Sequence, residues 1–509
     1  MQLFVKKYSN RVSVVDAACV VAIAIALFFI QKDHLRLDFW NDEIYTLKNF
    51  VFVPISTTLT DYHIPNNHIF FNLLNNIFLK LIGIHHLHDL MENPILVRIL
   101  PFTYALMTLW LVYFFGKKFF SLSVGILSVI ILLTSVGFFN FGLQVRGYSL
   151  SMLLLMTMIY GSASYIRADK NKYLYLTAVA ACLAFFTVPI NIYPILGTAT
   201  FFFFASVFFK YKKQHRTSIK YFKVDVALGL GSLLGFIFYL PNFEAVFFNE
   251  YVISQHAFNS KVFEEFIPGF WKGYLNKRYL LTYLLIGGIG VSVLTKKGFF
   301  FKNENVLLFT TCCVPFLLNF VRGEEIPERA LSMLIPILSI VLGVGIVSIF
   351  RINNKVRTFA LLGVFLIGGY CYYVFQNEIV SIEAQLQLNL HGGHRSQNLT
   401  YNYYMAHYQP LAAARYFHDN YSKKSSPLVV FSCEPHGFYN YLEKFDISYL
   451  KKDALMDLLK NKVPKVFVVA RFPNEVHQYI KDHFGDTYDV QNLQVDFTYN
   501  NFLRLTVKS

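Results

Sequence analysis

The chain has 509 residues, of which 55% are hydrophobic and only 15% are charged, and its formal net charge is +15. Repeated apolar runs in such a chain exclude a single water-soluble core and indicate a polytopic membrane protein. The positive charge does not indicate nucleic-acid binding, because no basic stripe with interleaved aromatic residues lies in a polar segment. The six cysteines follow no disulfide or metal spacing. No cofactor is therefore indicated, although a divalent cation is left open.

The first apolar run follows a short basic segment that contains Lys6, Lys7 and Arg11. This run covers about residues 12–30 and lacks a small-residue cleavage site, so it is typical of an uncleaved signal anchor. The amino terminus is then expected in the cytoplasm, since basic residues favour that side.

Eleven apolar segments are each long enough, or nearly so, to cross a bilayer. They are residues 12–30, 96–116, 121–139, 147–166, 173–189, 193–210, 225–241, 279–295, 304–321, 330–350 and 358–376.

Alternate connections between these segments are basic. Connections 1–11, 117–120, 167–172, 210–223, 296–302 and 351–357 hold 20 of the 46 Lys and Arg residues, but only one of the 31 acidic residues. Basic loops mark the cytoplasmic side of a membrane protein. The pattern therefore predicts eleven crossings, with an extracytoplasmic carboxyl terminus.

Residues 66–83 form one further apolar segment that is not expected to cross. Counting it as a span would move 17 of the 20 basic residues to the wrong side. His68, Asn72, Asn75 and Asn76 also make a polar stripe at helical spacing, opposite Phe70, Leu74, Ile77 and Leu81. The segment is expected to be a juxtamembrane helix along the outer interface.

The tail from residue 377 to residue 509 differs in composition from the rest of the chain. Strand-like runs at 427–431, 465–469 and 502–507 alternate with helix-like stretches near 405–420, 451–461 and 473–484. We expect two domains, a transmembrane domain at 1–376 and a small extracytoplasmic α/β domain at 377–509. The tail has no catalytic motif.

Adjacent carboxylates, Asp42 and Glu43, follow the first apolar run at the membrane edge. Ionisable groups at this depth are costly unless they are paired or functional, which makes them candidate site residues. Neighbouring positions on a helix or turn point in different directions, so separate roles are expected. The structural alternative is an N-terminal helix cap.

Basic residues on the same side are candidate anion-binding groups, because a guanidinium offers a planar, permanently charged fork. Arg98 starts the second span, and Gln144, Arg146 and Tyr148 precede or open the fourth. Interfacial anchoring is the alternative for both arginines. For Arg329, in the charge-rich segment before the tenth span, the alternative is a solvated loop. His63 and His68 suggest a metal site only weakly, because their spacing matches no zinc pattern.

Taken in order, "NDEIYTL", "DYHIPNNHIFFNLLNNIFLKLIG", "VRILPFTYALMTLWLVYFFGKKFF" and "VRGYSLSMLLL" resemble the GT-C membrane glycosyltransferases. The similar members are protein O-mannosyltransferases, lipid A aminoarabinose transferases and galacturonosyl transferases of the lipopolysaccharide core. The resemblance covers about residues 10 to 375. Two positions depart from the family pattern: Ile69-Phe70-Phe71 replaces Pro-Pro-Leu, and Gln144 replaces a glutamate.

The resemblance implies an inverting hexosyl or pentosyl transfer from a polyprenyl phosphate to a lipid, glycan or protein acceptor. Asp42 would be the base, and Glu43, the second catalytic residue, would orient the acceptor or the donor. In the transmembrane catalytic domain so implied, the membrane would be a bacterial inner membrane, and the tail would recognise the acceptor. Arg98 and Arg146 would meet the phosphate, and His68, Gln144, Tyr148 and Arg329 would bind substrate.

Two other functions remain open from the residues alone. A secondary transporter is disfavoured, because the charges gather at one face and no internal repeat is evident. A non-catalytic lipid-binding scaffold would have the same topology, but it would not need Asp42 and the arginines to converge.

Overall fold

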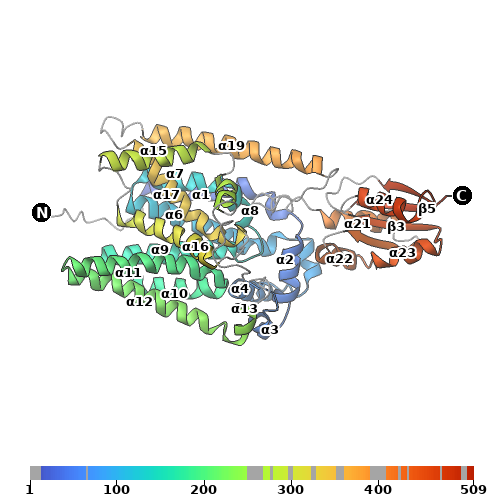
Figure 1. Ribbon diagram of the computed structural model, residues 1–509, viewed down its shortest axis with the longest axis horizontal. Helices are drawn as coiled ribbons and strands as arrows, with labels where there is room; N and C mark the ends of the chain where they lie inside the picture. The colour runs from blue at the N-terminus through green and yellow to red at the C-terminus, as the bar shows by residue number, and fades with distance from the viewer. Residues whose placement is uncertain are drawn as a thin grey trace.

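The computed structural model describes most of the chain. The described residues are 13–64, 67–248, 267–275, 279–295, 302–322, 328–350, 360–389, 409–421, 426–432, 435–470, 473–493 and 501–508. Figure 1 shows a large helical body, with the C-terminal sheet domain at the end of the molecule opposite the amino terminus.

Long helices coincide with the predicted apolar segments. They are α1 (Val14–Gln31), α6 (Ile95–Phe119), α7 (Leu122–Leu133), α9 (Tyr148–Ala168), α10 (Lys172–Thr187), α11 (Ile192–Tyr211), α12 (His215–Ile237), α15 (Tyr279–Thr295), α16 (Asn303–Arg322), α17 (Ile335–Ile349) and α19 (Ala360–Asn389). The predicted polytopic helical architecture is confirmed, because each helix hydrogen-bonds its own backbone and buries or lipid-exposes an apolar surface.

Six of the helices within the described residues are long and apolar enough to cross a membrane. A seventh span is obtained if α12 and the segment Leu240–Val246, bent by 58°, are counted as one. Shorter apolar helices include α7, α10 and part of α15. The count of eleven crossings stays a prediction.

The segment predicted as one span at 121–139 is divided. Helix α7 ends at Leu133, and α8 (Val136–Phe141) starts after a break at Thr134 and Ser135. The Thr134 hydroxyl donates to the carbonyl of Ile130, so this side chain hydrogen-bonds to the backbone in the last turn of α7. The break directs the chain toward residues 142–147, which lead into α9.

Helix α4 (Ile69–Leu81) lies in the segment predicted to be juxtamembrane, and its polar stripe faces the protein. Asn72, Asn75 and Asn76 are buried, whereas Leu81 on the apolar face is 79% exposed. The Asn76 amide donates to the carbonyl of Val53 at 2.8 Å. A thirteen-residue helix is about 20 Å long, which is too short to cross the hydrocarbon core. The exposed apolar face suits contact with lipid.

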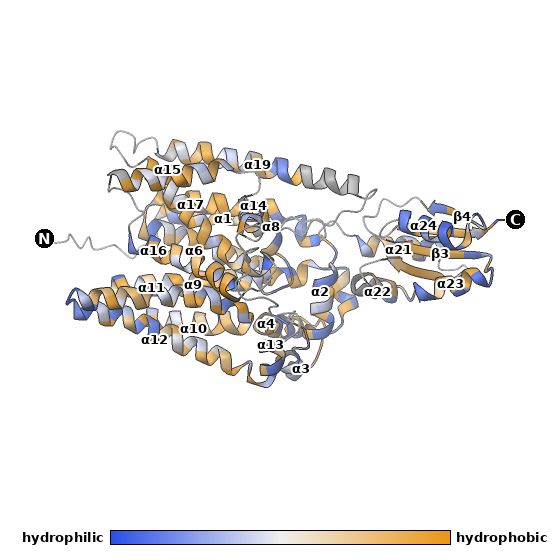
Figure 2. Cartoon of the chain, viewed as in Figure 1, coloured by the Kyte–Doolittle hydropathy of each residue, from blue (hydrophilic) through white to orange (hydrophobic). Residues whose placement is uncertain are grey.

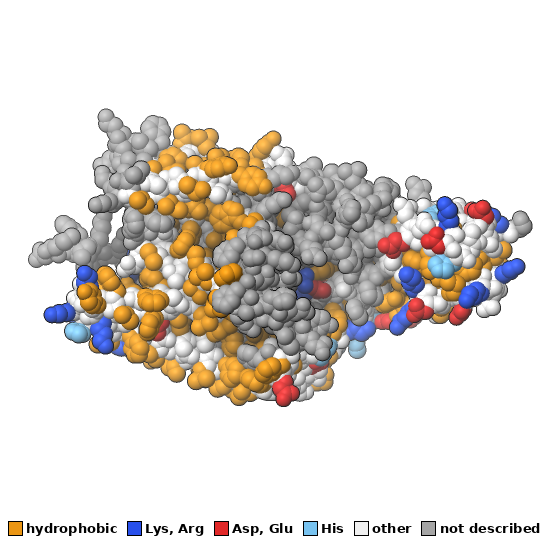
Figure 3. Space-filling view, in the orientation of Figure 1, with side chains coloured by type: hydrophobic (Ala, Val, Ile, Leu, Met, Phe, Trp, Pro, Cys, Tyr) orange, Lys and Arg blue, Asp and Glu red, His pale blue; other side chains and the backbone are white. Residues whose placement is uncertain are grey.

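The surface divides along the long axis of the molecule. Hydrophobic residues dominate the helical body in Figure 2, and hydrophobic side chains cover much of its visible surface in Figure 3. Lys and Arg side chains gather at the ends of α11 and α12 that lie farthest from the C-terminal domain. Their connection contains the exposed residues Lys210, Lys212 and Lys213.

The C-terminal domain contains a five-stranded sheet with the order β2-β1-β3-β5-β4. Its strands are β1 (Leu428–Ser432), β2 (Leu450–Lys451), β3 (Lys465–Ala470), β4 (Tyr488–Leu493) and β5 (Asn501–Val507). Strands β2, β1 and β3 are parallel, and β5 pairs antiparallel with both β3 and β4. Its helices are α21 (Pro410–Tyr421), α22 (Pro435–Lys444), α23 (Asp453–Lys460) and α24 (Pro473–Phe484). The predicted small α/β unit is confirmed.

The domain boundary predicted at residue 376 falls inside α19, which continues to Asn389. The division into domains at that point remains a prediction.

The C-terminal domain contacts the chain just before and within α2 (Asn41–Thr46), the short helix that contains Asp42 and Glu43. The buried Tyr441 hydroxyl of α22 accepts from the Phe39 amide at 2.9 Å and donates to the Phe39 carbonyl at 3.3 Å. Lys48 donates to Asn440 at 3.0 Å. The Asp38 carboxylate accepts from the Leu411 amide at 2.9 Å, at the start of α21. The domain therefore holds the backbone that leads into the carboxylate pair.

The Tyr441→Phe substitution is expected to loosen this backbone without changing the packing of the ring. It removes both hydrogen bonds to Phe39, each worth about 1 kcal/mol. Hydrogen–deuterium exchange should be about tenfold faster in peptides covering residues 37–46. Tyr449→Phe, at a partly exposed hydroxyl of the same domain, is the control. Unchanged exchange in Tyr441→Phe would contradict the role of this contact.

Candidate active site

Glu43 joins three segments of the chain through its carboxylate: the start of α2, helix α6 and the turn before α9. Its Oε2 accepts from the Trp40 amide at 3.2 Å and from the Arg98 guanidinium at 3.0 Å. Its Oε1 accepts from the Val145 amide at 2.8 Å. The residue is 2% exposed. A carboxylate with these partners is neutralised and nearly saturated, so the helix-cap interpretation describes Glu43 well.

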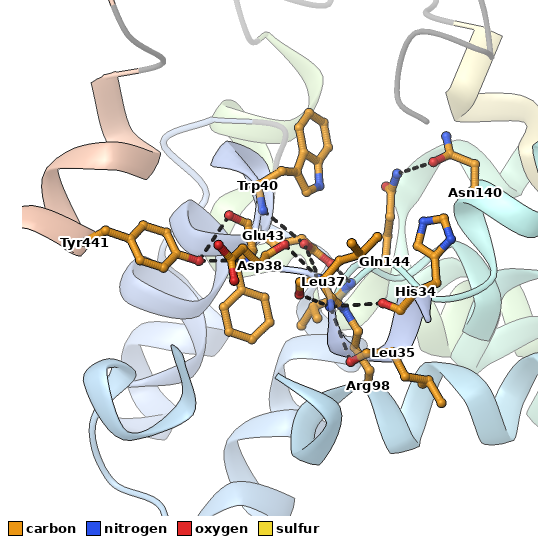
Figure 4. A network of polar contacts seen from close by, with 12 residues as sticks. His34, Leu35, Leu37, Asp38, Trp40, Glu43, Arg98, Asn140, Gln144 and Tyr441 are labelled. Atoms are coloured by element: carbon orange, nitrogen blue, oxygen red, sulfur yellow. Dashed lines mark hydrogen bonds and ion pairs between the residues drawn. The ribbon is translucent and has the colours of Figure 1, made fainter. Parts of the chain in front are cut away.

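Arg98, on α6, is also occupied by the protein. It is 4% exposed, and its guanidinium lies 5.1 Å from the centre of the Phe39 ring. Besides Glu43, it donates to the backbone carbonyls of His34, Leu35, Leu37 and Asp38. Figure 4 shows these bonds converging on one side chain. The guanidinium orders the chain between α1 and α2, and an incoming phosphate would have to displace several of these contacts.

Asp42 turns away from Glu43 and pairs with Arg146. The Asp42 side chain is 22% exposed, whereas that of Arg146 is 4% exposed. The guanidinium of Arg146 also lies 5.3 Å from the centre of the Tyr148 ring. As expected for adjacent helical residues, the two carboxylates have different partners. Asp42 is the more accessible of the two.

His68 lies behind this ion pair, at the start of α4. Its Nδ1 accepts from the Gly147 amide at 2.6 Å, and its ring packs edge-on against Tyr148. A Cβ at Gly147 would lie 2.9 Å from that nitrogen, so the close approach requires glycine. Burial, together with Arg146 and Arg329 nearby, holds the pKa of His68 well below its usual range. The imidazole is therefore neutral and carries its proton on Nε2.

Arg329 and Gln144 complete the set of predicted site residues. Arg329 lies in the short 3-10 helix η6 (Glu328–Leu334) and is near enough to His68 to depress its pKa. Gln144 precedes Arg146 in the turn before α9, and its amide donates weakly to Asn140 at 3.5 Å. The fold thus brings Asp42, His68, Arg146, Tyr148 and Arg329 to one region, and Glu43, Arg98 and Gln144 to the adjacent one.

Some polar contacts could not be anticipated from spacing. Tyr45 is hydrogen-bonded to His63 at 2.6 Å, and His63 to Asp61 at 2.5 Å. Asp38 meets Leu411, and Tyr441 meets Phe39, each across more than 370 residues of sequence. No group of three or more His, Cys, Asp and Glu residues suited to a metal ion is present in the described part of the chain. The sequence indicated only that Asp38 lies near Asp42 and Glu43 in the chain.

Comparison with known proteins gives two informative results. Residues 81–239 match the family model described as dolichyl-phosphate-mannose-protein mannosyltransferase. The fold is similar to that of ArnT from Cupriavidus metallidurans bound to undecaprenyl phosphate, with a TM-score of 0.53, 12% identity, and coverage of 97% of this chain and 98% of ArnT. The chain therefore has a fold similar to that of ArnT, and its residues 81–239 are similar to the mannosyltransferase family.

Further matches agree with this glycosyltransferase fold. ArnT in the apo state gives a TM-score of 0.54 at 12% identity, with coverage of 96% and 97% of the two chains. The Archaeoglobus fulgidus oligosaccharyltransferase complex with Zn and sulfate gives 0.49 at 13% identity, with coverage of 95% of this chain and 73% of that one. That last likeness is too distant to support an inference. No curated protein sequence matches.

The Asp38→Asn substitution is expected to raise the thermal stability of the protein at neutral pH. Burial raises the pKa of Asp38 to about 6, although the Leu411 amide, Arg98 and Arg415 oppose this. The folded state therefore binds this proton more tightly than the unfolded state, and its contribution is lost as the pH rises from about 4 to about 6. A shift of about two units corresponds to at most about 3 kcal/mol. Asn retains an oxygen for the Leu411 amide.

The measurement is Tm in detergent as a function of pH. The variant should exceed the parent above pH 6, and the two should converge near pH 4. Asp457→Asn, at an exposed residue of α23, is the control. A parent protein whose Tm rises between pH 4 and 6 relative to Asp38→Asn would contradict the assignment.

Proposed function

We propose that this protein transfers a sugar from a polyprenyl phosphate to a hydroxyl of a lipid, glycan or protein acceptor at the extracytoplasmic face of the membrane. The observation that carries the proposal is the ion pair between the accessible Asp42 and the buried Arg146. His68 lies beside this pair and is a neutral hydrogen-bond donor at Nε2. A base and an anion site lie next to each other, at the end of the helical body where a membrane-anchored donor would present its phosphate.

The anion site consists of Arg146, Arg329 and His68. Arg146 and Arg329 both lie near His68 and supply two positive charges that an anion could pair with. His68 Nε2 and the Tyr148 hydroxyl would add neutral donors. Positive charge here stabilises the negative charge that develops on the departing phosphate.

Asp42 is the proposed base. In a single displacement, the acceptor oxygen forms a bond to the anomeric carbon and its proton passes to an Asp42 carboxylate oxygen. The bond from that carbon to the phosphate oxygen breaks, and its electron pair leaves with the phosphate. The configuration of the anomeric carbon is inverted. Donor phosphate would compete with Asp42 for Arg146 and so free the carboxylate to accept the proton.

We propose a role for Arg98 that differs from the phosphate binding expected from the sequence. Its guanidinium holds Glu43 and four backbone carbonyls, so we propose that it orders the site and does not bind the phosphate. Glu43 likewise positions α2 and takes no proton.

The Asp42→Asn substitution should abolish transfer while donor binding persists. Asn has the size of Asp but cannot accept the proton, and general-base catalysis contributes about 10²- to 10⁴-fold in rate. Turnover and donor affinity would be measured on purified protein with a polyprenyl-phosphate sugar. Near-normal turnover in Asp42→Asn would exclude Asp42 as the base.

The arginines should separate into two classes. Arg146→Gln and Arg329→Gln should weaken donor binding about 10- to 100-fold as well as turnover, because charge-assisted bonds to phosphate are lost. Arg98→Gln should instead lower Tm, since it leaves buried Glu43 without its counter-charge. The assignment is wrong if Arg98→Gln is as stable as the parent and specifically loses donor affinity.

The orientation of the protein can be tested with single cysteines in a background that lacks the six native ones. The basic connection between α11 and α12 is expected in the cytoplasm and the C-terminal domain outside. Lys212→Cys should be protected from an impermeant thiol reagent in intact cells, and Asp419→Cys should be labelled. Labelling of both residues from the same side would contradict this topology.

A further inference from the structure

A small polar cavity lies beside α2, on the Glu43 side of the site. Trp40, Glu43, Arg98, Asn140, Leu143 and Gln144 contribute to its lining. Its volume is about 20 Å³, which is room for one water molecule or one hydroxyl group and not for a sugar ring. Figure 4 shows Trp40 and Gln144 flanking the Glu43–Arg98 network.

Two polar atoms of this lining lack a partner among the described residues. They are the indole nitrogen of Trp40 and the side-chain oxygen of Gln144. Both residues are only 8% exposed. A buried polar group without a hydrogen bond costs about 1–3 kcal/mol, so such a pair requires explanation. One atom is a donor and the other is an acceptor.

The charged groups of the lining are already engaged. Both oxygens of Glu43 accept hydrogen bonds, and Arg98 donates to Glu43 and to backbone carbonyls. Asp38, which also lines the cavity, accepts from the Leu411 amide. The buried atoms of Trp40 and Gln144 without a partner are a neutral indole N–H and a neutral amide oxygen, and His34 and Asn140 add further polar groups to the lining. Together the indole N–H and the amide oxygen complement a hydroxyl, which accepts one hydrogen bond and donates one.

We propose that this cavity is a specificity subsite for one uncharged sugar hydroxyl, on either the donor or the acceptor. The proposal rests on the proposed function. The hydroxyl accepts from Trp40 Nε1 and donates to Gln144 Oε1. An ammonium group has only donors and could not accept from Trp40 Nε1. A carboxylate has only acceptors and could not donate to Gln144 Oε1. The subsite therefore selects against amino and carboxyl substituents at this position.

Gln144 is the residue at which the sequence departs from the glutamate of similar glycosyltransferases. The change from a carboxylate to an amide removes one negative charge and keeps the size and the acceptor.

The first test uses the unmodified full-length protein. Polyprenyl-phosphate sugars that each lack one hydroxyl are compared with the parent sugar, and acceptors that each lack one hydroxyl are compared in the same way. Removal of one particular hydroxyl should lower kcat/KM about 100-fold or more, because the two buried polar atoms then remain unpaired. The series in which the loss occurs identifies the donor or the acceptor as the source.

The second test exchanges the charge of the subsite. Gln144→Glu should raise kcat/KM for an amino-substituted sugar relative to the neutral sugar by at least about tenfold. Trp40→Phe should reduce the discrimination against the deoxy sugar. Gln478→Glu, in the C-terminal domain, is the matched control and should change neither ratio. Tm measurements show which variants are folded.

The outcomes separate the two proposals. Transfer that tolerates every single deoxy change within about threefold would overturn the subsite and indicate a cavity that holds only water. An unaltered preference in folded Gln144→Glu would do the same. If no polyprenyl-phosphate sugar is used at all, the proposed function fails, and the subsite assignment fails with it.

Discussion

The buried ion pair between Glu43 and Arg98 is the interaction on which the rest of the site depends. It joins α2 to α6, and through the Val145 amide it also joins α2 to the turn that contains Arg146. Removal of one partner of such a buried pair typically costs about 3–5 kcal/mol, because the other charge is left uncompensated. With Glu43 fixed, the adjacent Asp42 must point from a different side of α2, where it meets Arg146. The paired carboxylate of Glu43 thus positions the proposed base.

The C-terminal domain extends this constraint from outside the helical body. Tyr441 holds both polar groups of the Phe39 backbone, and Asp38 caps the start of α21. These contacts of the described part of the domain lie two and three residues before α2. If the domain recognises the acceptor, as proposed, the acceptor would lie next to the proposed base.

The helices were predictable because each membrane helix satisfies its own backbone and shows its length as an apolar run. The strand-like runs of the tail were predictable from their composition, whereas the two-residue strand β2 and the exposed strand β4 lack such a signal. The role of Arg98 could not be predicted from the sequence. Its residue type and membrane depth fit a phosphate ligand, but the backbone carbonyls that it binds belong to a segment about 60 residues earlier. The polar stripe of α4 could be recognised in the sequence. That it faces the protein depends on hydrogen-bond partners elsewhere in the chain, such as Val53 and Asn67.

The central claim is that Glu43 and Arg98 form a fixed scaffold while Asp42 and Arg146 do the chemistry. An experimental structure of the full-length protein with a polyprenyl phosphate bound tests this claim most directly. The account predicts the phosphate within hydrogen-bonding distance of Arg146 and Arg329, with the Arg98 guanidinium still on Glu43. A phosphate bound by Arg98, with the Glu43–Arg98 pair broken, would contradict it.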